Sequence, residues 1–181
     1  STNGLILNID RPANLINCSV SVDIEMTLPK NVNLDLVSHN GQIKIDNISG
    51  YTNATTHNGQ INVNNISGVT ILRTHNGQID AEGISRDIDF VSHNGKVKAE
   101  FSEAAEPDCD ITMVTHNGGI ELTTPRNYSA KVSVSTHNGS IKTELPLTVS
   151  GEFSDKSLTG TIGDGQGDMK LETYNGSIKI R

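Results

Sequence analysis

Apolar and polar residues alternate on both sides of a tripeptide, His-Asn-Gly, that recurs along the chain. The residues five and three positions before four of the six histidines are both apolar, as in Leu34 and Leu36. The alternation resumes two and four positions after the glycine, as in Ile43 and Ile45. A period of two residues is typical of a strand with one buried face. Each copy of the tripeptide therefore predicts two short strands joined at an Asn-Gly corner.

All six histidines of the chain stand in this tripeptide: His39, His57, His75, His93, His116 and His137. The glycines that follow them are separated by 18, 18, 18, 23 and 21 residues. A seventh copy, Tyr174-Asn175-Gly176, comes 37 residues later, and residues 158–162 form a degenerate copy between. Self-similarity at a fixed period near twenty indicates stacked repeats, in which each unit buries its apolar face against the next.

A second turn signal follows the strand after each Asn-Gly corner. It reads Asn-Ile-Ser-Gly at residues 47–50 and again at residues 65–68. We expect Gly50 and Gly68 to supply the positive φ of a tight corner. One coil of about 18 residues is then a strand, an Asn-Gly corner, a second strand and a second corner.

Asn-Gly between alternating strands also favours antiparallel hairpins, so a meander must be weighed against a parallel solenoid. Only in the solenoid do equivalent positions of successive coils stack about 4.8 Å apart. This stacking explains why the same residue type recurs at the same position of each repeat. Two columns should form hydrogen-bonded ladders. One is Asn40, Asn58, Asn76, Asn94, Asn117 and Asn138, and the other is Ser38, Thr56, Thr74, Ser92, Thr115 and Thr136.

We therefore predict an all-β fold, a parallel single-stranded β-helix (solenoid) of about 18-residue coils with no helices of note. Residues 1–181 should form a single β-solenoid domain. Residues 1–33 would be N-terminal lead-in strands, residues 34–146 regular His-Asn-Gly coils, and residues 147–181 irregular closing coils. If residues 177–181 form the last strand, its edge is unpaired unless residues 147–167 cover it, and an open edge would permit end-to-end self-association.

Composition narrows the classes of partner. Aromatic residues make up 3% of the chain, there is no Trp, and the formal net charge is -7. Both properties oppose nucleic-acid binding, which relies on base-stacking rings and phosphate-pairing cations. The longest apolar runs, about four residues, are far shorter than the roughly 20 of a membrane helix, so no transmembrane span is expected. The start, Ser1-Thr2-Asn3-Gly4, does not look like a natural initiator and hints at a removed signal peptide.

The histidines are the most conspicuous candidates for chemistry. The parity of the preceding strand points them outward, and we interpret them as a stacked imidazole ladder. The alternative is that the histidines bind a row of metal ions. Structural zinc requires ligands that converge on one point, whereas stacked parallel imidazoles direct their lone pairs side by side. The residues after the glycines add no carboxylate to complete a shell. We expect no metal and no cofactor.

Catalysis is not expected either. Glycoside hydrolysis needs two carboxylates at a defined separation, whereas the acidic residues scatter over the repeat without a recurring column. The extra residues in the two longest regular coils fall at the corner opposite the histidines, in residues 102–107 and 124–128. Such insertions often mark a recognition edge, although tolerated surface loops remain the simpler interpretation. The candidate recognition residues there are Glu103, Glu106, Arg126 and Tyr128.

Residues 28–41, which run from Leu-Pro-Lys-Asn to the first His-Asn-Gly, resemble the start of the repeat array in the bacterial and archaeal adhesin family of right-handed β-solenoids. Residues 140–146, 158–163 and 173–180 resemble its closing coils. The resemblance spans residues 28–181 and implies an extracellular or envelope protein without catalysis. It brings no catalytic or ligand residues. The histidines depart from the small polar residues that the family would lead us to expect before Asn-Gly.

We therefore expect a non-enzymatic binding and adhesion module at the cell surface, in the extracellular space or in the periplasm. Its partner would be a surface ligand, either a glycan or a protein, and not nucleic acid. The alternative function is a carbohydrate-active solenoid, an enzyme resembling polysaccharide lyases or hydrolases or a lectin-like module, that uses the variable-loop edge.

Overall fold

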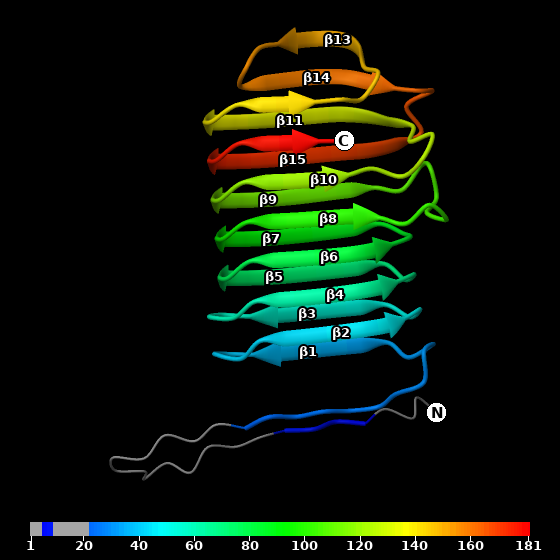
Figure 1. The fold of residues 1–181 in the computed structure, drawn as a ribbon, viewed down its shortest axis with the longest axis vertical. Coiled ribbons are helices and arrows are strands. Elements are labelled where there is room, and N and C mark those ends of the chain that lie inside the picture. Colours follow the sequence, from blue (N-terminus) through cyan, green and yellow to red (C-terminus); the bar gives the residue numbers. More distant parts are fainter. Residues whose placement is uncertain (1–4, 9–21) are drawn as a thin grey trace.

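The chain folds into a stack of two-stranded coils. The computed structural model describes residues 5–8 and 22–181, and within these residues it contains strands and no helix. The strands form two sheets that face each other across the apolar core (Figure 1). Within the regular array every strand pairs in parallel with strands of neighbouring coils. The predicted parallel β-solenoid is therefore confirmed, and the antiparallel meander is excluded for this array.

One coil contributes one strand to each sheet. The first sheet has the spatial order β1 (Leu34–Ser38), β3 (Thr52–Thr56), β5 (Thr70–Asn76), β7 (Ile88–Asn94), β9 (Ile111–Asn117), β15 (Gly167–Asn175), β11 (Ala130–Asn138), β14 (Ser157–Ile162), β13 (Thr148–Phe153). The second sheet has the order β12 (Ile141–Thr143), β16 (Ile178–Ile180), β10 (Ile120–Thr123), β8 (Val97–Phe101), β6 (Ile79–Ile84), β4 (Ile61–Ile66), β2 (Ile43–Ile48).

The core consists of columns in which apolar residues of successive coils stack on one another. In the first sheet, Leu72 lies opposite Phe90, and Phe90 opposite Met113, all three fully buried. In the second sheet Ile61 pairs with Ile79, also fully buried. Burial of this continuous column is the main stabilising contribution of a solenoid, because one coil alone has no second apolar layer to pack against.

The last coil does not lie at the end of the stack. Strand β15 pairs in parallel with both β9 and β11, and β16 pairs in parallel with both β10 and β12. Residues 167–180 are thus inserted between two coils that precede them in the sequence, as the red ribbon among yellow and green ones shows in Figure 1. The expectation that residues 177–181 form an unpaired edge is wrong, since β16 is paired on both sides.

The end of the first sheet is covered by a hairpin. Strand β14 pairs antiparallel with β11, and β13 pairs antiparallel with β14. Residues 147–167 therefore cap the stack, as expected, but they cover β11 and not the last strand. The degenerate copy at residues 158–162 is not a further parallel coil, because it forms the antiparallel strand β14.

Gly50 and Gly68, at the second corner, are needed for space and not for their φ angle. Positive φ occurs at Asn47 and Asn65, three residues before Gly50 and Gly68. Asparagine tolerates this region better than most residues. A Cβ at Gly68 would lie 2.1 Å from the carbonyl oxygen of Gly50, where no side chain fits. The predicted positive φ at Gly50 and Gly68 is therefore wrong, although the predicted corner is present.

The lead-in to the solenoid forms no strand in its described part, residues 5–8 and 22–33. The expected lead-in strands are therefore wrong for this part, and the rest lies outside the described residues. Six apolar side chains here are exposed by 44% to 81%: Leu5, Ile6, Leu7, Val22, Ile24 and Met26. Leu28 and Val32, nearer the first coil, pack against the end of the core. Strands β1 and β2 form the first rung, and among residues 5–8 and 22–181 each pairs with a strand on one side only.

Candidate ligand groove

The predicted imidazole ladder is confirmed, with one addition. Adjacent rings from His39 to His116 stack with centroids 4.8 to 5.0 Å apart. Tyr174 on the inserted coil then lies between His116 and His137, at 5.0 and 4.5 Å. We call these seven rings the ring column. Because the rings stack face to face, their edges point to solvent and offer a row of imidazole nitrogens, with one phenol among them.

A groove with a volume of about 910 Å³ runs beside the ring column on the outer face of the first sheet. Each of seven coils contributes its ring, the hydroxyl residue before it and the outward residue two positions before the ring. The outward residues, in spatial order, are Val37, Thr55, Arg73, Val91, Val114, Glu172 and Ser135. The floor and wall are largely apolar around the middle coils, where Val91 pairs with Val114.

The hydroxyl column forms hydrogen bonds other than those predicted. Thr74 Oγ1 donates to the carbonyl of Gly59 (3.0 Å), and Ser92 Oγ donates to the carbonyl of Gly77 (2.8 Å). Thr56, Thr115, Thr136 and Thr173 make the equivalent bond to the glycine of the neighbouring coil, whereas Ser38, on the first coil, accepts from the amide of Gly41. The predicted ladder of hydroxyl-to-hydroxyl bonds is therefore wrong, because a glycine carbonyl without a side chain over it lies within reach.

The asparagine ladder is confirmed. The first asparagine, Asn40, only accepts. Each further Asn Nδ2 donates to the Oδ1 of the rung before it at 2.7 to 2.9 Å, in the spatial order Asn58, Asn76, Asn94, Asn117, Asn175 and Asn138. The side chains of these asparagines are exposed. The ladder lies next to the ring column at the same corner, but its asparagines are not among the residues that line the groove.

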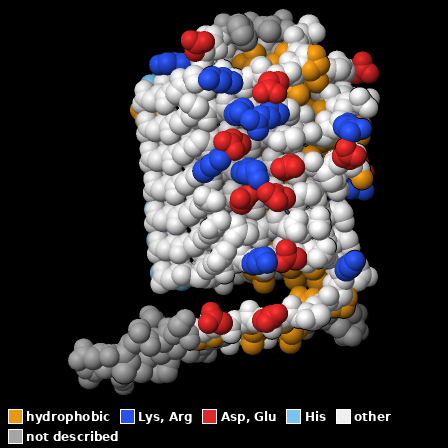
Figure 2. Space-filling view, in the orientation of Figure 1, with side chains coloured by type: hydrophobic (Ala, Val, Ile, Leu, Met, Phe, Trp, Pro, Cys, Tyr) orange, Lys and Arg blue, Asp and Glu red, His pale blue; other side chains and the backbone are white. Residues whose placement is uncertain are grey.

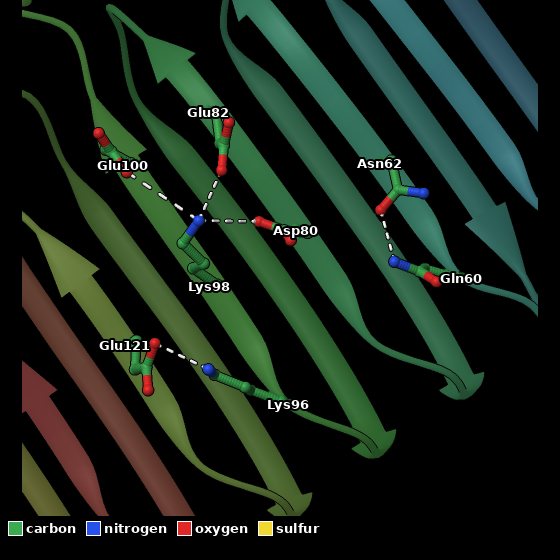
Figure 3. Close-up of polar contacts among 8 residues, drawn as sticks. All are labelled: Gln60, Asn62, Asp80, Glu82, Lys96, Lys98, Glu100 and Glu121. Atoms are coloured by element: carbon green, nitrogen blue, oxygen red, sulfur yellow. Dashed lines mark hydrogen bonds and ion pairs between the residues drawn. The ribbon is translucent and has the colours of Figure 1, made fainter.

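The outer face of the second sheet carries mixed charge instead of a groove. Figure 2 shows a face on which acidic and basic side chains are intermixed and histidine appears only at an edge. Lys98 Nζ lies 2.6 Å from Glu82 and 3.5 Å from Asp80 (Figure 3). The hydrogen bond with Glu82 raises the pKa of Lys98. Lys96 lies 2.7 Å from Glu121 and lowers the pKa of that carboxyl through its hydrogen bond.

The candidate recognition loops are held mainly by internal contacts. Arg126 pairs with Glu103, and Arg86 pairs with Glu106 at 2.9 Å. Tyr128 is only 4% exposed, and its hydroxyl donates to the carbonyl of Cys109 (2.9 Å). Burial raises the pKa of both Tyr128 and Cys109, the latter to about 12. The expectation that Tyr128 offers a recognition surface is therefore wrong, because the ring belongs to the core.

Metal ligation was the alternative interpretation of the histidines. Within the described residues, no group of three or more His, Cys, Asp and Glu side chains is placed to hold a metal ion. No helix in residues 5–8 and 22–181 is long and apolar enough to cross a membrane.

The sequence predicts the ring column and the asparagine ladder but not the groove. Its wall lies two residues before each ring, where the side chains vary from Val to Arg. The seventh copy, Tyr174-Asn175-Gly176, predicts one more ring in the column but not its place between His116 and His137.

Comparison with known proteins places the chain in a family whose function is unknown. Residues 6–181 match the family described as Domain of unknown function (DUF7330), and the chain belongs to it. No curated protein and no solved structure matches the chain significantly.

Proposed function

We propose that this protein is a non-enzymatic binding and adhesion module of the cell surface or envelope, with the groove beside the ring column as its ligand surface. The observation that carries the proposal is the regularity of the groove, to which seven coils contribute equivalent positions. Exposed clefts that combine apolar walls with a few ordered polar groups are typical ligand sites. The resemblance to bacterial and archaeal adhesins supports the same function and an extracellular or periplasmic location.

The shape of the groove favours a linear ligand that lies along the solenoid axis. Seven rings separated by steps of 4.5 to 5.0 Å span roughly 30 Å. This step is close to the length of one sugar in an extended 1,4-linked glycan. The strands beneath the groove from β3 to β11 are paired on both sides. A peptide therefore cannot add to the sheet there as an extra strand, which removes one common mode of peptide binding and favours a glycan as the ligand.

The alternative, a carbohydrate-active solenoid that uses the loop edge, has less support. Of the four loop candidates, Tyr128 is buried, and Glu103 is paired with Arg126. Glu106 is paired with Arg86. Carboxylates held by arginine are poor general acids, because the cation favours their ionised form. We therefore assign binding to the groove and not to the loops.

An array of linear polysaccharides tests the proposal. The groove variant replaces Val91 and Val114 with Gln, which is longer, polar and uncharged. The matched control is Asn64→Gln on the outer face of β4 in the other sheet. We expect the wild type and the control to retain the same glycan without cleaving it, and the groove variant to lose it. Equal retention by the groove variant, or release of shortened sugar chains, would contradict the proposal.

A further inference from the structure

The ring column has a property that a neutral groove would lack, namely six protonatable groups in a straight row. Histidine is the side chain that ordinarily gains its charge between pH 5 and 8. The six imidazoles lie in a single stack, separated by one phenol, with centroids 4.5 to 5.0 Å apart from ring to ring. The other side chains that line the groove are mostly neutral.

The charged groups that face the column come from few strands. Arg73 on β5 and Glu172 on β15 are the charged side chains, apart from histidine, among the described residues that line the groove. Arg73 is paired with Asp89 on β7, and Glu172 lies 3.6 Å from Lys170. Asp35 on β1 lies four residues before His39, and Lys156 lies opposite Thr136 beside β11. The lining strands β3, β9 and β11 place Thr55, Val114 and Ser135 in the groove.

Protonation therefore creates a linear array of positive charge. Two unit charges 4.9 Å apart repel by about 0.8 kcal/mol even at the dielectric constant of water. A row of such charges attracts counter-anions, and a polyanion that displaces them is bound in a salt-dependent way. Six added charges would also offset most of the formal net charge of -7. The repulsion of a polyanion by the whole protein would then fall at the same pH at which the groove gains its charge.

We propose that the groove binds a linear acidic polysaccharide, a polyuronate, and that binding is coupled to protonation of the ring column. This inference rests on the proposed function and names its ligand class. A polyuronate carries about one carboxylate per sugar, which corresponds to one charge for each step of the column. Nucleic acid is less suitable because base stacking needs free ring faces. Here the inner ring faces are covered by their neighbours.

The test uses polygalacturonate, with fully methyl-esterified polygalacturonate as its neutral counterpart and poly(dT) as the nucleic acid. We expect polygalacturonate to bind roughly tenfold or more tightly at pH 5 than at pH 7.5, since several exposed ion pairs each add a fraction of a kcal/mol. Binding near pH 6 should take up protons, seen as a dependence of the calorimetric enthalpy on the ionisation enthalpy of the buffer. Higher salt should weaken the binding at pH 5 more than at pH 7.5.

The decisive variant replaces His75, His93 and His116 with Tyr. Tyr174 already occupies this column, so the variant retains the stack but cannot gain charge at pH 5. Its circular dichroism and melting curve should match those of the wild type. We expect it to lose most of the pH dependence and the proton uptake. If the variant does not fold, the single change His93→Tyr should still lower the proton uptake.

The outcomes separate this inference from the proposed function. Binding of polygalacturonate that is equal at both pH values, without proton uptake, would overturn the inference. If the ester then bound through Val91 and Val114, the proposed function would stand. Tighter binding of poly(dT) than of polygalacturonate at pH 5 would overturn the assignment to polysaccharide. Failure of every polysaccharide to bind at the groove would overturn both.

Discussion

The substitution Gly95→Ala tests whether the close spacing of the coils requires glycine at the Asn-Gly corners. A Cβ at Gly95 would lie 1.8 Å from the carbonyl oxygen of Gly77 on the preceding coil and 2.5 Å from its carbon. The nearest backbone must therefore move by more than 1 Å for Gly95→Ala to fit. That same Gly77 oxygen accepts the hydrogen bond of the buried Ser92 hydroxyl. Overpacking costs about 1 to 3 kcal/mol, and a buried hydroxyl without its partner costs about 1 to 3 kcal/mol more.

We therefore expect Gly95→Ala to lower the free energy of unfolding by about 2 to 6 kcal/mol, a large part of the 5 to 15 kcal/mol of a typical domain. The matched control is Gly119→Ala in the adjacent column, where a Cβ would lie 3.2 Å from the nearest atom, the Ser177 oxygen. This control should lose less than about 1 kcal/mol. Urea unfolding followed by circular dichroism measures the free energy of unfolding of both variants, and the two values can be compared if the m-value is unchanged. A loss below about 1 kcal/mol for Gly95→Ala would refute the steric argument.

Four further predictions concern the ladder, the cap, the thiol and the lead-in. Asn76→Ala removes two exposed hydrogen bonds of the asparagine ladder and should lower the free energy of unfolding by about 0.5 to 1.5 kcal/mol. Urea unfolding compares this loss with that of Asn64→Ala, and equal losses would mean that the ladder adds no stability. Replacing residues 147–166 by a short Gly-Ser linker exposes β11 and should cause association in light scattering; a monodisperse monomer would argue against the cap. Cys109 should resist iodoacetamide at pH 8 until the protein unfolds, because its raised pKa, about 12, leaves little thiolate; rapid labelling of the native protein would contradict its burial. The exposed apolar side chains of the lead-in should promote self-association. Sedimentation should show weaker self-association when Ile24 is replaced by Lys, and a wild-type protein that stays monomeric at high concentration would contradict this role.

The fold could be predicted from the sequence because one coil fixes the pattern for the others. The alternation around His-Asn-Gly identifies both strands, and the common register of like residues identifies the parallel stack. The order of the last coil could not be predicted in this way. Residues 167–180 have a coil's pattern whichever rung they join, so the pattern does not determine their place in the stack.

The site was predictable only where it repeats. The histidine parity predicts outward stacked rings, and the structure has them. Hydrogen-bond partners and burial depend on distances that a sequence pattern does not contain. The Ser92 hydroxyl thus bonds to a glycine carbonyl and not to a neighbouring hydroxyl. Tyr128 looked like a loop residue by position, but its insertion folds back so that the ring enters the core.

The central claim, that the groove beside the ring column is the ligand surface, is tested most directly by NMR of the histidine side chains. The protein would carry labelled imidazoles and backbone amides and would be titrated with the polysaccharide that the array retains most tightly. We predict shifts of the signals of His75, His93 and His116 in the middle of the column, with the amides of β4 in the other sheet unchanged. Shifts confined to the second sheet, or to the loop at residues 102–107, with unperturbed imidazoles would contradict the account.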